Sequence, residues 1–176
     1  VISTLMILQM LLPTAVFAAD TDYVCYIGQT GYESLASAVA AANAGDTIWM
    51  TADDEVTNNV TIDKSLVIEL DGHTLSDAAL KFSGDITVKL NDRVGTAKFN
   101  TSRDCGFNVT DYTKDARLRA PLFLSNGANV IITGSTSGTE FFGGATCTDG
   151  LQILEKVAAV GKNCSLTVNG ARFVYS

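Results

Sequence analysis

The sequence predicts an all-β fold, a parallel β-helix, in which short strands wind into coils that stack on one another. From Asp46 onward the residues are mostly β-branched, aromatic, Gly, Asn and Asp, a composition of short strands and turns. The chain also contains an internal repeat of strand, polar turn and strand, at residues 66–75, 86–99, 130–141 and 166–173. A further strand precedes each repeat, at residues 60–62, 80–82, 122–124 and 157–160. Such repeats bury their apolar faces only by stacking, so we expect about four coils of three strands each.

The chain begins with an uncharged apolar run, residues 1–19, that ends in small residues. This is the composition of a secretory signal peptide, cleaved after Ala18 or Ala19. A transmembrane anchor is the alternative, but Pro13 interrupts a run already short against the roughly 20 apolar residues of a spanning helix. We therefore expect a secreted or cell-surface protein, with residues 20–176 as the β-helix domain and no membrane span in the mature chain.

One amphipathic helix is expected before the strands, over residues 32–43. Its apolar face at helical spacing consists of Tyr32, Leu35, Ala36, Val39 and Ala42. The dipeptide at residues 44–45 ends the helix, and β structure begins at residues 46–50.

Alternation along the repeats predicts which side chains face the core. This alternation places Val67 and Glu69 on the outer face. Aligning Leu66 with Ile86 gives the shortest step between coils, twenty residues. We expect ten inward side chains to be nearly fully buried: Leu66, Ile68, Leu70, Ile86, Val88, Leu90, Val130, Ile132, Leu166 and Val168.

The charge balance excludes one class of partner. Twelve Lys and Arg against nineteen Asp and Glu give a net charge of -7. A nucleic-acid partner needs a basic face that displaces counterions, so we expect no nucleic-acid binding.

The helix and the first strands resemble the opening of a known family. The segments 34–42, 45–50 and 66–75 are similar to the capping helix and first coil of secreted right-handed β-helix proteins, the pectate-lyase-like superfamily. The resemblance covers about residues 30–75 closely and the remainder only as a repeat pattern. It implies right-handed coils behind an N-terminal cap. It implies no particular activity, because the same opening occurs on lyases, hydrolases and noncatalytic surface proteins.

Both ends of the sequence favour a fragment. The leading run lacks an initiator Met and a charged n-region, and the chain stops at Ser176 just after a coil strand. Because last coils are normally capped, we expect the N-terminal part of a longer β-helix.

Enzymes of this superfamily cut acidic polysaccharides with a calcium site of several Asp plus an Arg, or with an Asp cluster, a His and a Lys. Neither set is complete here. The segment 71–73 contains the only histidine, but Asp and Gly there favour a turn with His73 in solvent. The acids at 53–55 could supply oxygen ligands to calcium, although a solvated surface run is the favoured interpretation. We expect no catalytic residue, no metal and no cofactor.

The better candidate site is the long insertion at residues 100–120, because loops of this length often carry binding residues. Aromatic faces can stack on sugar rings while Arg and Asp bond hydroxyls and carboxylates. The alternative is a solvated loop that packs on the neighbouring coil. The candidate ligand-binding residues are Arg103, Asp104, Phe107, Asp111, Tyr112, Arg117 and Arg119.

Four cysteines fit an oxidising compartment, and their separations match no zinc site. Cys105 and Cys147 leave adjacent coils at nearly the same point. Stacked strands about 4.8 Å apart suit the roughly 5.5 Å between disulfide-linked Cα atoms, so we expect one disulfide, Cys105 to Cys147. Cys25 and Cys164 are expected to be unpaired, with Cys164 as a small buried hydrophobe.

These observations favour a noncatalytic adhesive or carbohydrate-binding protein, whose partner is an extracellular polysaccharide or a host or cell-surface glycan. Two alternatives remain. One is the N-terminal part of a polysaccharide lyase or glycoside hydrolase that acts on acidic polysaccharides, and the other is a structural surface spacer.

Overall fold

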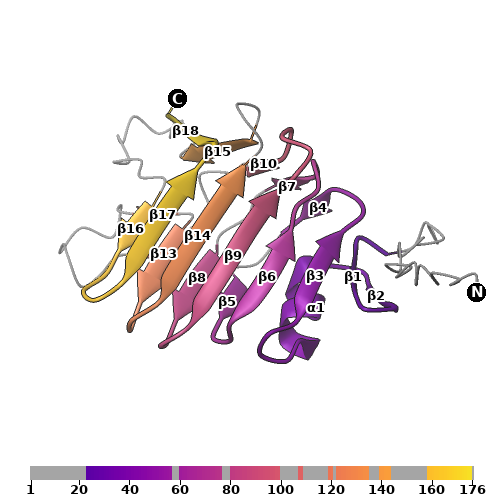
Figure 1. The fold of residues 1–176 in the computed structure, drawn as a ribbon, viewed down its shortest axis with the longest axis horizontal. Helices are drawn as coiled ribbons and strands as arrows, with labels where there is room; N and C mark the ends of the chain where they lie inside the picture. The colour runs from indigo at the N-terminus through magenta and orange to yellow at the C-terminus, as the bar shows by residue number, and fades with distance from the viewer. Residues whose placement is uncertain are drawn as a thin grey trace, which may run out of the picture.

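The described part of the protein is mostly β, with three sheets of largely parallel strands and one short helix (Figure 1). The computed structural model describes residues 23–56, 60–76, 80–99, 107–108, 119–120, 122–134, 139–143 and 158–175. The apolar run that the sequence predicts as a signal peptide, residues 1–19, lies outside these residues. The all-β prediction is confirmed for the described part of the chain.

The strands fall into three sheets and one small pair. The seven-stranded sheet has the order β17-β14-β9-β6-β3-β1-β2 and consists of β1 (Cys25–Ile27), β2 (Thr30–Tyr32), β3 (Thr47–Met50), β6 (Leu66–Glu69), β9 (Thr87–Asp92), β14 (Asn129–Gly134) and β17 (Ser165–Asn169). The five-stranded sheet consists of β4 (Asp54–Glu55), β7 (Thr74–Ser76), β10 (Lys98–Phe99), β15 (Thr139–Gly143) and β18 (Ala171–Tyr175). The four-stranded sheet consists of β5 (Val60–Ile62), β8 (Leu80–Ser83), β13 (Leu122–Ser125) and β16 (Ala158–Val160). Outside these sheets, β11 (Phe107–Asn108) pairs antiparallel with β12 (Arg119–Ala120).

The chain visits the three sheets in a fixed order. It passes from the four-stranded sheet to the seven-stranded and then to the five-stranded sheet, as β5-β6-β7, β8-β9-β10, β13-β14-β15 and β16-β17-β18. Strands from successive passes pair in parallel. In Figure 1 the seven-stranded sheet lies in front of the four-stranded sheet, and the five-stranded sheet lies along the top. The repeated strands that the sequence predicts are confirmed.

The expected step of twenty residues between the first two repeats is wrong. Leu66 pairs with Val88 rather than with Ile86, so the step is twenty-two residues. The preceding strands do differ by twenty residues, because Val60 pairs with Leu80. The two additional residues therefore lie in the turn before β9, where the Ile86 N–H donates to the Gly84 carbonyl at 2.8 Å. A shift by two leaves each side chain on its predicted face.

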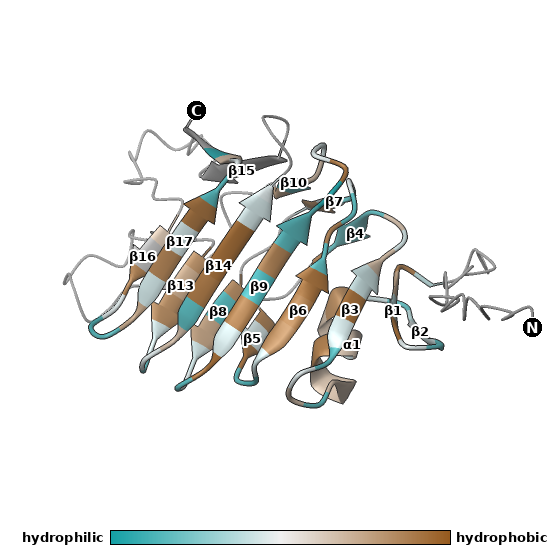
Figure 2. Ribbon diagram, in the orientation of Figure 1, coloured by the Kyte–Doolittle hydropathy of each residue, from teal (hydrophilic) through white to brown (hydrophobic). Residues whose placement is uncertain are grey.

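The core lies between the three sheets, and side chains alternate between it and the outer surface. Figure 2 shows this alternation of hydrophobic and hydrophilic residues along β9. Eight of the ten predicted inward side chains are buried: Leu66, Ile68, Leu70, Ile86, Val88, Leu90, Val130 and Ile132. The prediction is wrong for Leu166, which is half-buried, and for Val168, which is 37% exposed. Both lie on β17, which is at the edge of its sheet and pairs with β14 alone among the described strands, so nothing described covers its other side.

The helix α1 (Leu35–Ala41) is shorter than expected and is rotated relative to the expected face. It begins after Ser34, whose hydroxyl accepts from the Ser37 N–H in a capping box. Tyr32 belongs to β2, and Ala36 is exposed. The buried face consists of Leu35, Ala38, Val39 and Ala42, which follow the i, i+3, i+4, i+7 spacing. Among the described residues, no helix is long and apolar enough to cross a membrane.

Lys64 closes the C-terminal end of α1. Its Nζ donates to the carbonyls of Val39 at 3.1 Å, Ala40 at 3.3 Å and Ala42 at 2.8 Å. A cation at this end also interacts favourably with the helix dipole. Lys64→Met is therefore expected to lower the free energy of unfolding by about 1 to 2 kcal/mol, measured by urea unfolding with circular dichroism. Lys89→Met, on the exposed side of β9, is the matched control, and an equal loss in both variants would contradict the capping role.

Candidate functional site

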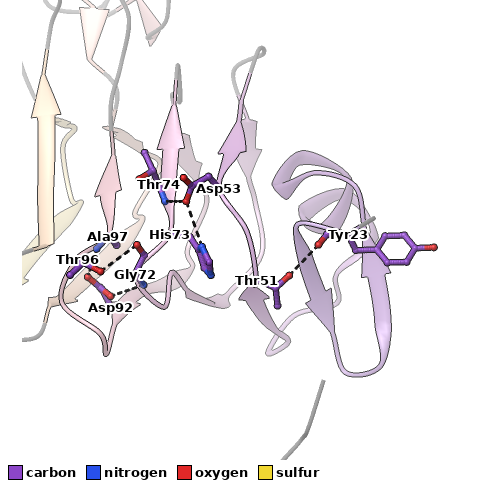
Figure 3. Close-up of polar contacts among 9 residues, drawn as sticks. All are labelled: Tyr23, Thr51, Asp53, Gly72, His73, Thr74, Asp92, Thr96 and Ala97. Atoms are coloured by element: carbon purple, nitrogen blue, oxygen red, sulfur yellow. Dashed lines mark hydrogen bonds and ion pairs between the residues drawn. The ribbon is translucent and has the colours of Figure 1, made fainter. Parts of the chain in front are cut away.

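The segment around the only histidine forms a turn, as the sequence predicts. Asp71 and Gly72 both have positive φ values, 49° and 88°, and the His73 N–H donates to the Leu70 carbonyl at 2.9 Å. The expectation that His73 lies in solvent is wrong. Its side chain is 30% exposed, and its Nδ1 lies 3.5 Å from Oδ1 of Asp53 (Figure 3). The same Asp53 oxygen accepts from the Thr74 backbone, which orders the residues around the imidazole.

The three adjacent acids point to different places. Asp53 is exposed and accepts the Thr74 N–H at 2.8 Å. Asp54 is buried, and its Oδ2 accepts the Leu35 N–H at 2.7 Å, so the solvated-run interpretation is wrong for this residue. Glu55 is exposed on β4. Alternation along the strand separates the carboxylates, and the described residues contain no group of three His, Cys, Asp or Glu side chains that could hold a metal ion.

The two described cysteines, Cys25 and Cys164, do not form a reactive site. Cys25 is fully buried and its thiol donates to the Ser34 carbonyl at 3.5 Å. Burial, with a smaller contribution from the charge of Asp54, raises the pKa of the Cys25 thiol to about 12, so the thiol stays protonated at neutral pH and is a poor nucleophile. Cys164 is half-buried rather than buried, and both are free thiols. Cys105 and Cys147 lie outside the described residues, so their disulfide stays a prediction.

Most of the predicted binding loop also lies outside the described residues. Within it the structure describes β11 and β12, which place Asn108 opposite Arg119 and Phe107 opposite Ala120 in an antiparallel pair. The backbones of two candidate residues, Phe107 and Arg119, are thereby brought close together. The remaining candidates lie in undescribed segments: Arg103, Asp104, Asp111, Tyr112 and Arg117.

The register of the seven-stranded sheet aligns a different set of side chains that the sequence did not reveal. Cross-strand partners form one continuous line, which we call the outer row: Gly31, Tyr26, Trp49, Glu69, Asn91, Thr133 and Asn169. The row crosses all seven strands. Along the central strands its members alternate with the buried residues Ile48, Ile68 and Leu90, so it lies on the outer face of the sheet.

One half of the outer row is aromatic. The ring of Tyr23 covers Gly31, where a Cβ atom would overlap with it, and the ring meets Tyr26 edge-on at 5.9 Å between centroids. Tyr23 remains 37% exposed and Trp49 is half-buried. Cζ of Arg93 lies 4.8 Å from the centroid of the Trp49 ring, a cation–π contact. This half presents aromatic surface beside a guanidinium group.

The other half is polar, and its centre is Glu69. This residue faces outward as predicted but is only 8% exposed, because Asn91 and Arg93 from the next pass cover it. Asn91 Nδ2 donates to Glu69 Oε1 at 2.9 Å. Arg93 Nη2 donates to Asp71 Oδ1 at 3.3 Å, and its Nε lies 3.6 Å from Glu69 Oε2. Among the described residues, no hydrogen-bond donor reaches that Oε2 atom.

The outer row combines two chemical features on one surface. Aromatic faces can pack against the C–H face of a sugar ring, and carboxylate and amide groups can bond its hydroxyls. The sequence does carry one indication of this site, because alternation along their strands places both Trp49 and Glu69 on the outer face. The twenty-residue alignment placed Lys89 beside Glu69, whereas the true step places Asn91 there. The position of Arg93 over Trp49 has no signal in the sequence, because Arg93 lies in the loop after β9.

No protein-family model, curated protein or solved structure matches this chain. The parallel sheets are compatible with a β-helix, and the likeness to pectate-lyase-like proteins remains a resemblance of residues and repeats. The functional proposal therefore rests on the geometry of the outer row.

Proposed function

We propose that the three sheets are the sides of a right-handed parallel β-helix, and that this protein binds carbohydrate outside the cell without catalysis. The fixed order of passes through the sheets and the parallel pairing of successive passes support the β-helix. The position of α1 before the first complete pass fits a cap, because its apolar face joins the same core. The apolar leading run and the cysteine content favour secretion.

The observation that carries the carbohydrate proposal is the outer row. Neighbouring strands lie about 4.8 Å apart, so the row offers one side chain at each regular interval along the sheet. A polysaccharide that lies across the strands meets aromatic groups at Tyr23 and Trp49 and then polar groups from Glu69 onward. Ordered side chains on a rigid sheet lose little entropy when a ligand binds.

The contacts within the row favour recognition over chemistry. Glu69 is held by Asn91 and Arg93, and Asp71 is held by Arg93 as well. The Asp71 carboxylate, whose side chain is 37% exposed, can accept hydrogen bonds from a ligand in the geometry that Arg93 fixes. An adhesive or binding role on an extracellular polymer is therefore the function that this surface supports best.

Removing Trp49 from the outer row, or Tyr23, whose ring covers the row at Gly31, is expected to weaken glycan binding by about ten-fold or more. A ten-fold change corresponds to about 1.4 kcal/mol. The variants are Trp49→Ala and Tyr23→Ala. A glycan array identifies a ligand, and affinity electrophoresis in gels that contain it measures the dissociation constants. Thermal unfolding by circular dichroism confirms that the variants are folded.

The matched control is Phe123→Ala, which removes a half-buried aromatic side chain from the outer face of the four-stranded sheet. It is expected to bind as the unmodified protein does. Binding that is lost equally in all three variants, or a protein that binds no glycan on the array, would overturn the proposal.

A further inference from the structure

One face of the Trp49 ring already has a partner. Cζ of Arg93 lies 4.8 Å from the centroid of this ring, within the range of a cation–π contact. The Arg93 side chain is 60% exposed, whereas Trp49 is half-buried. The guanidinium group therefore lies on the solvent side of the indole, over the part of the ring that a sugar would reach first.

Two carboxylates hold Arg93 beside this ring. Its Nη2 donates to Oδ1 of Asp71 at 3.3 Å, and its Nε lies 3.6 Å from Oε2 of Glu69. Asp71 is the more exposed of the two acids. Because the arginine side chain is long and has several rotatable bonds, the guanidinium can leave the ring and still pair with Asp71. Displacement from the ring thus removes the cation–π contact without leaving the cation unpaired.

A sugar ring and the guanidinium need the same surface. The C–H groups of a sugar pack against an aromatic face at van der Waals distance, and a guanidinium group stacks on the same face. The two groups cannot cover one face of a single indole at the same time. A ligand that stacks on the exposed face of Trp49 must therefore move Arg93 aside.

We propose that Arg93 competes with the ligand for the exposed face of Trp49 and so lowers the affinity of the outer row for carbohydrate. This inference rests on the proposed carbohydrate-binding function and adds how access to the aromatic half of the row is controlled. Arg93 is then a positioning residue that acts through Trp49, and removing it should strengthen glycan binding.

The first measurement uses the fluorescence of Trp49, the only tryptophan in the chain. Acrylamide is a neutral quencher, so its access to the indole reports cover rather than charge. Arg93→Ala should raise the Stern–Volmer constant and shift the emission maximum to longer wavelength, because the ring gains contact with water. Arg93→Lys keeps a positive charge beside the two carboxylates but lacks the planar group, so it should act in the same direction if the alanine variant does not fold.

The matched control is Lys89→Ala, which removes a positive charge from the exposed side of β9, two strands away from β3. It should leave the quenching and the emission maximum unchanged. Thermal unfolding by circular dichroism confirms that the variants are folded.

The second measurement is affinity electrophoresis of the full chain with a glycan that the array identifies. Arg93→Ala should lower the dissociation constant by about two- to five-fold, the change that corresponds to an exposed cation–π contact. In the Trp49→Ala background the same change should have no effect, because Arg93 acts through the ring. Saturating glycan should bring the Stern–Volmer constants of Arg93→Ala and the unmodified protein together, since a sugar then covers the ring in both.

The outcomes separate this inference from the proposed function. A glycan that Trp49→Ala binds less tightly, but that Arg93→Ala binds no more tightly than the unmodified protein does, would refute the competition and leave the outer row as a carbohydrate site. Quenching that neither Arg93 variant changes would show that the guanidinium does not cover the indole, and would also refute the competition. An empty glycan array would refute the proposed function and this inference with it.

Discussion

Asp92→Ala is expected to lower the free energy of unfolding by about 3 to 5 kcal/mol, because it removes the acceptor of three backbone N–H groups at once. Asp92 is 2% exposed. Its Oδ1 accepts from Gly72 and Gly95, each at 3.0 Å, and its Oδ2 accepts from Ala97 at 2.8 Å. The carboxylate thus joins the turn after β6 to the loop after β9 (Figure 3). Alanine would leave the three donors without this acceptor, two of them in buried hydrogen bonds.

Urea unfolding followed by the fluorescence of Trp49, the only tryptophan, measures this loss. Asp92→Asn keeps one carbonyl oxygen as an acceptor. Its free energy of unfolding should therefore lie between those of the alanine variant and the unmodified protein. The control is Asp85→Ala, an exposed Asp in the turn before β9, with an expected change within about 0.5 kcal/mol. Equal stability of Asp92→Ala and Asp85→Ala would show that the carboxylate does not hold the two segments.

The strands and the faces of their residues were predictable because both depend on local pattern. Alternating polar and apolar side chains mark Thr87, Val88, Lys89 and Leu90 as a strand with two buried members, and the structure agrees. Alternation depends only on the extended backbone, so an alignment error of two residues left every face correct.

The lengths of turns were less predictable, because glycine and polar residues fit turns of several lengths. The turn at Gly84 holds two more residues than the equivalent one before Leu66, and this displaced the alignment of the first two repeats. Burial at the edge of a sheet also depends on which strands are neighbours. Val168 has an inward pattern but is exposed, because β17 has one described partner strand.

The candidate site depends on this same register, which explains why the sequence missed it. Trp49, Glu69 and Asn91 lie in one row only when the step between passes is known. The burial of Glu69 results from Arg93, a loop residue far along the chain whose position no periodicity predicts. Length and composition instead drew attention to the insertion at 100–120, of which the structure describes two short strands.

The largest effect is expected for Val88→Asp, which should prevent folding. Val88 is fully buried on β9, between Leu66 of β6 and Val130 of β14. The variant would place a carboxylate without a partner in this apolar ladder, and its desolvation cost is comparable with the roughly 5 to 15 kcal/mol that stabilises a typical domain. Far-UV circular dichroism and a thermal melt should show no cooperative transition.

Two further variants keep this prediction testable if the aspartate chain is insoluble. Thr87→Asp introduces the same charge one residue earlier, on the exposed face, and is expected to fold with a cooperative melt. Val88→Ala removes buried methyl groups without adding charge and is expected to lose about 2 kcal/mol in urea unfolding. A cooperative melt of Val88→Asp within a few degrees of that of Thr87→Asp would mean that residue 88 does not face a closed core, and would contradict the arrangement of the three sheets around it.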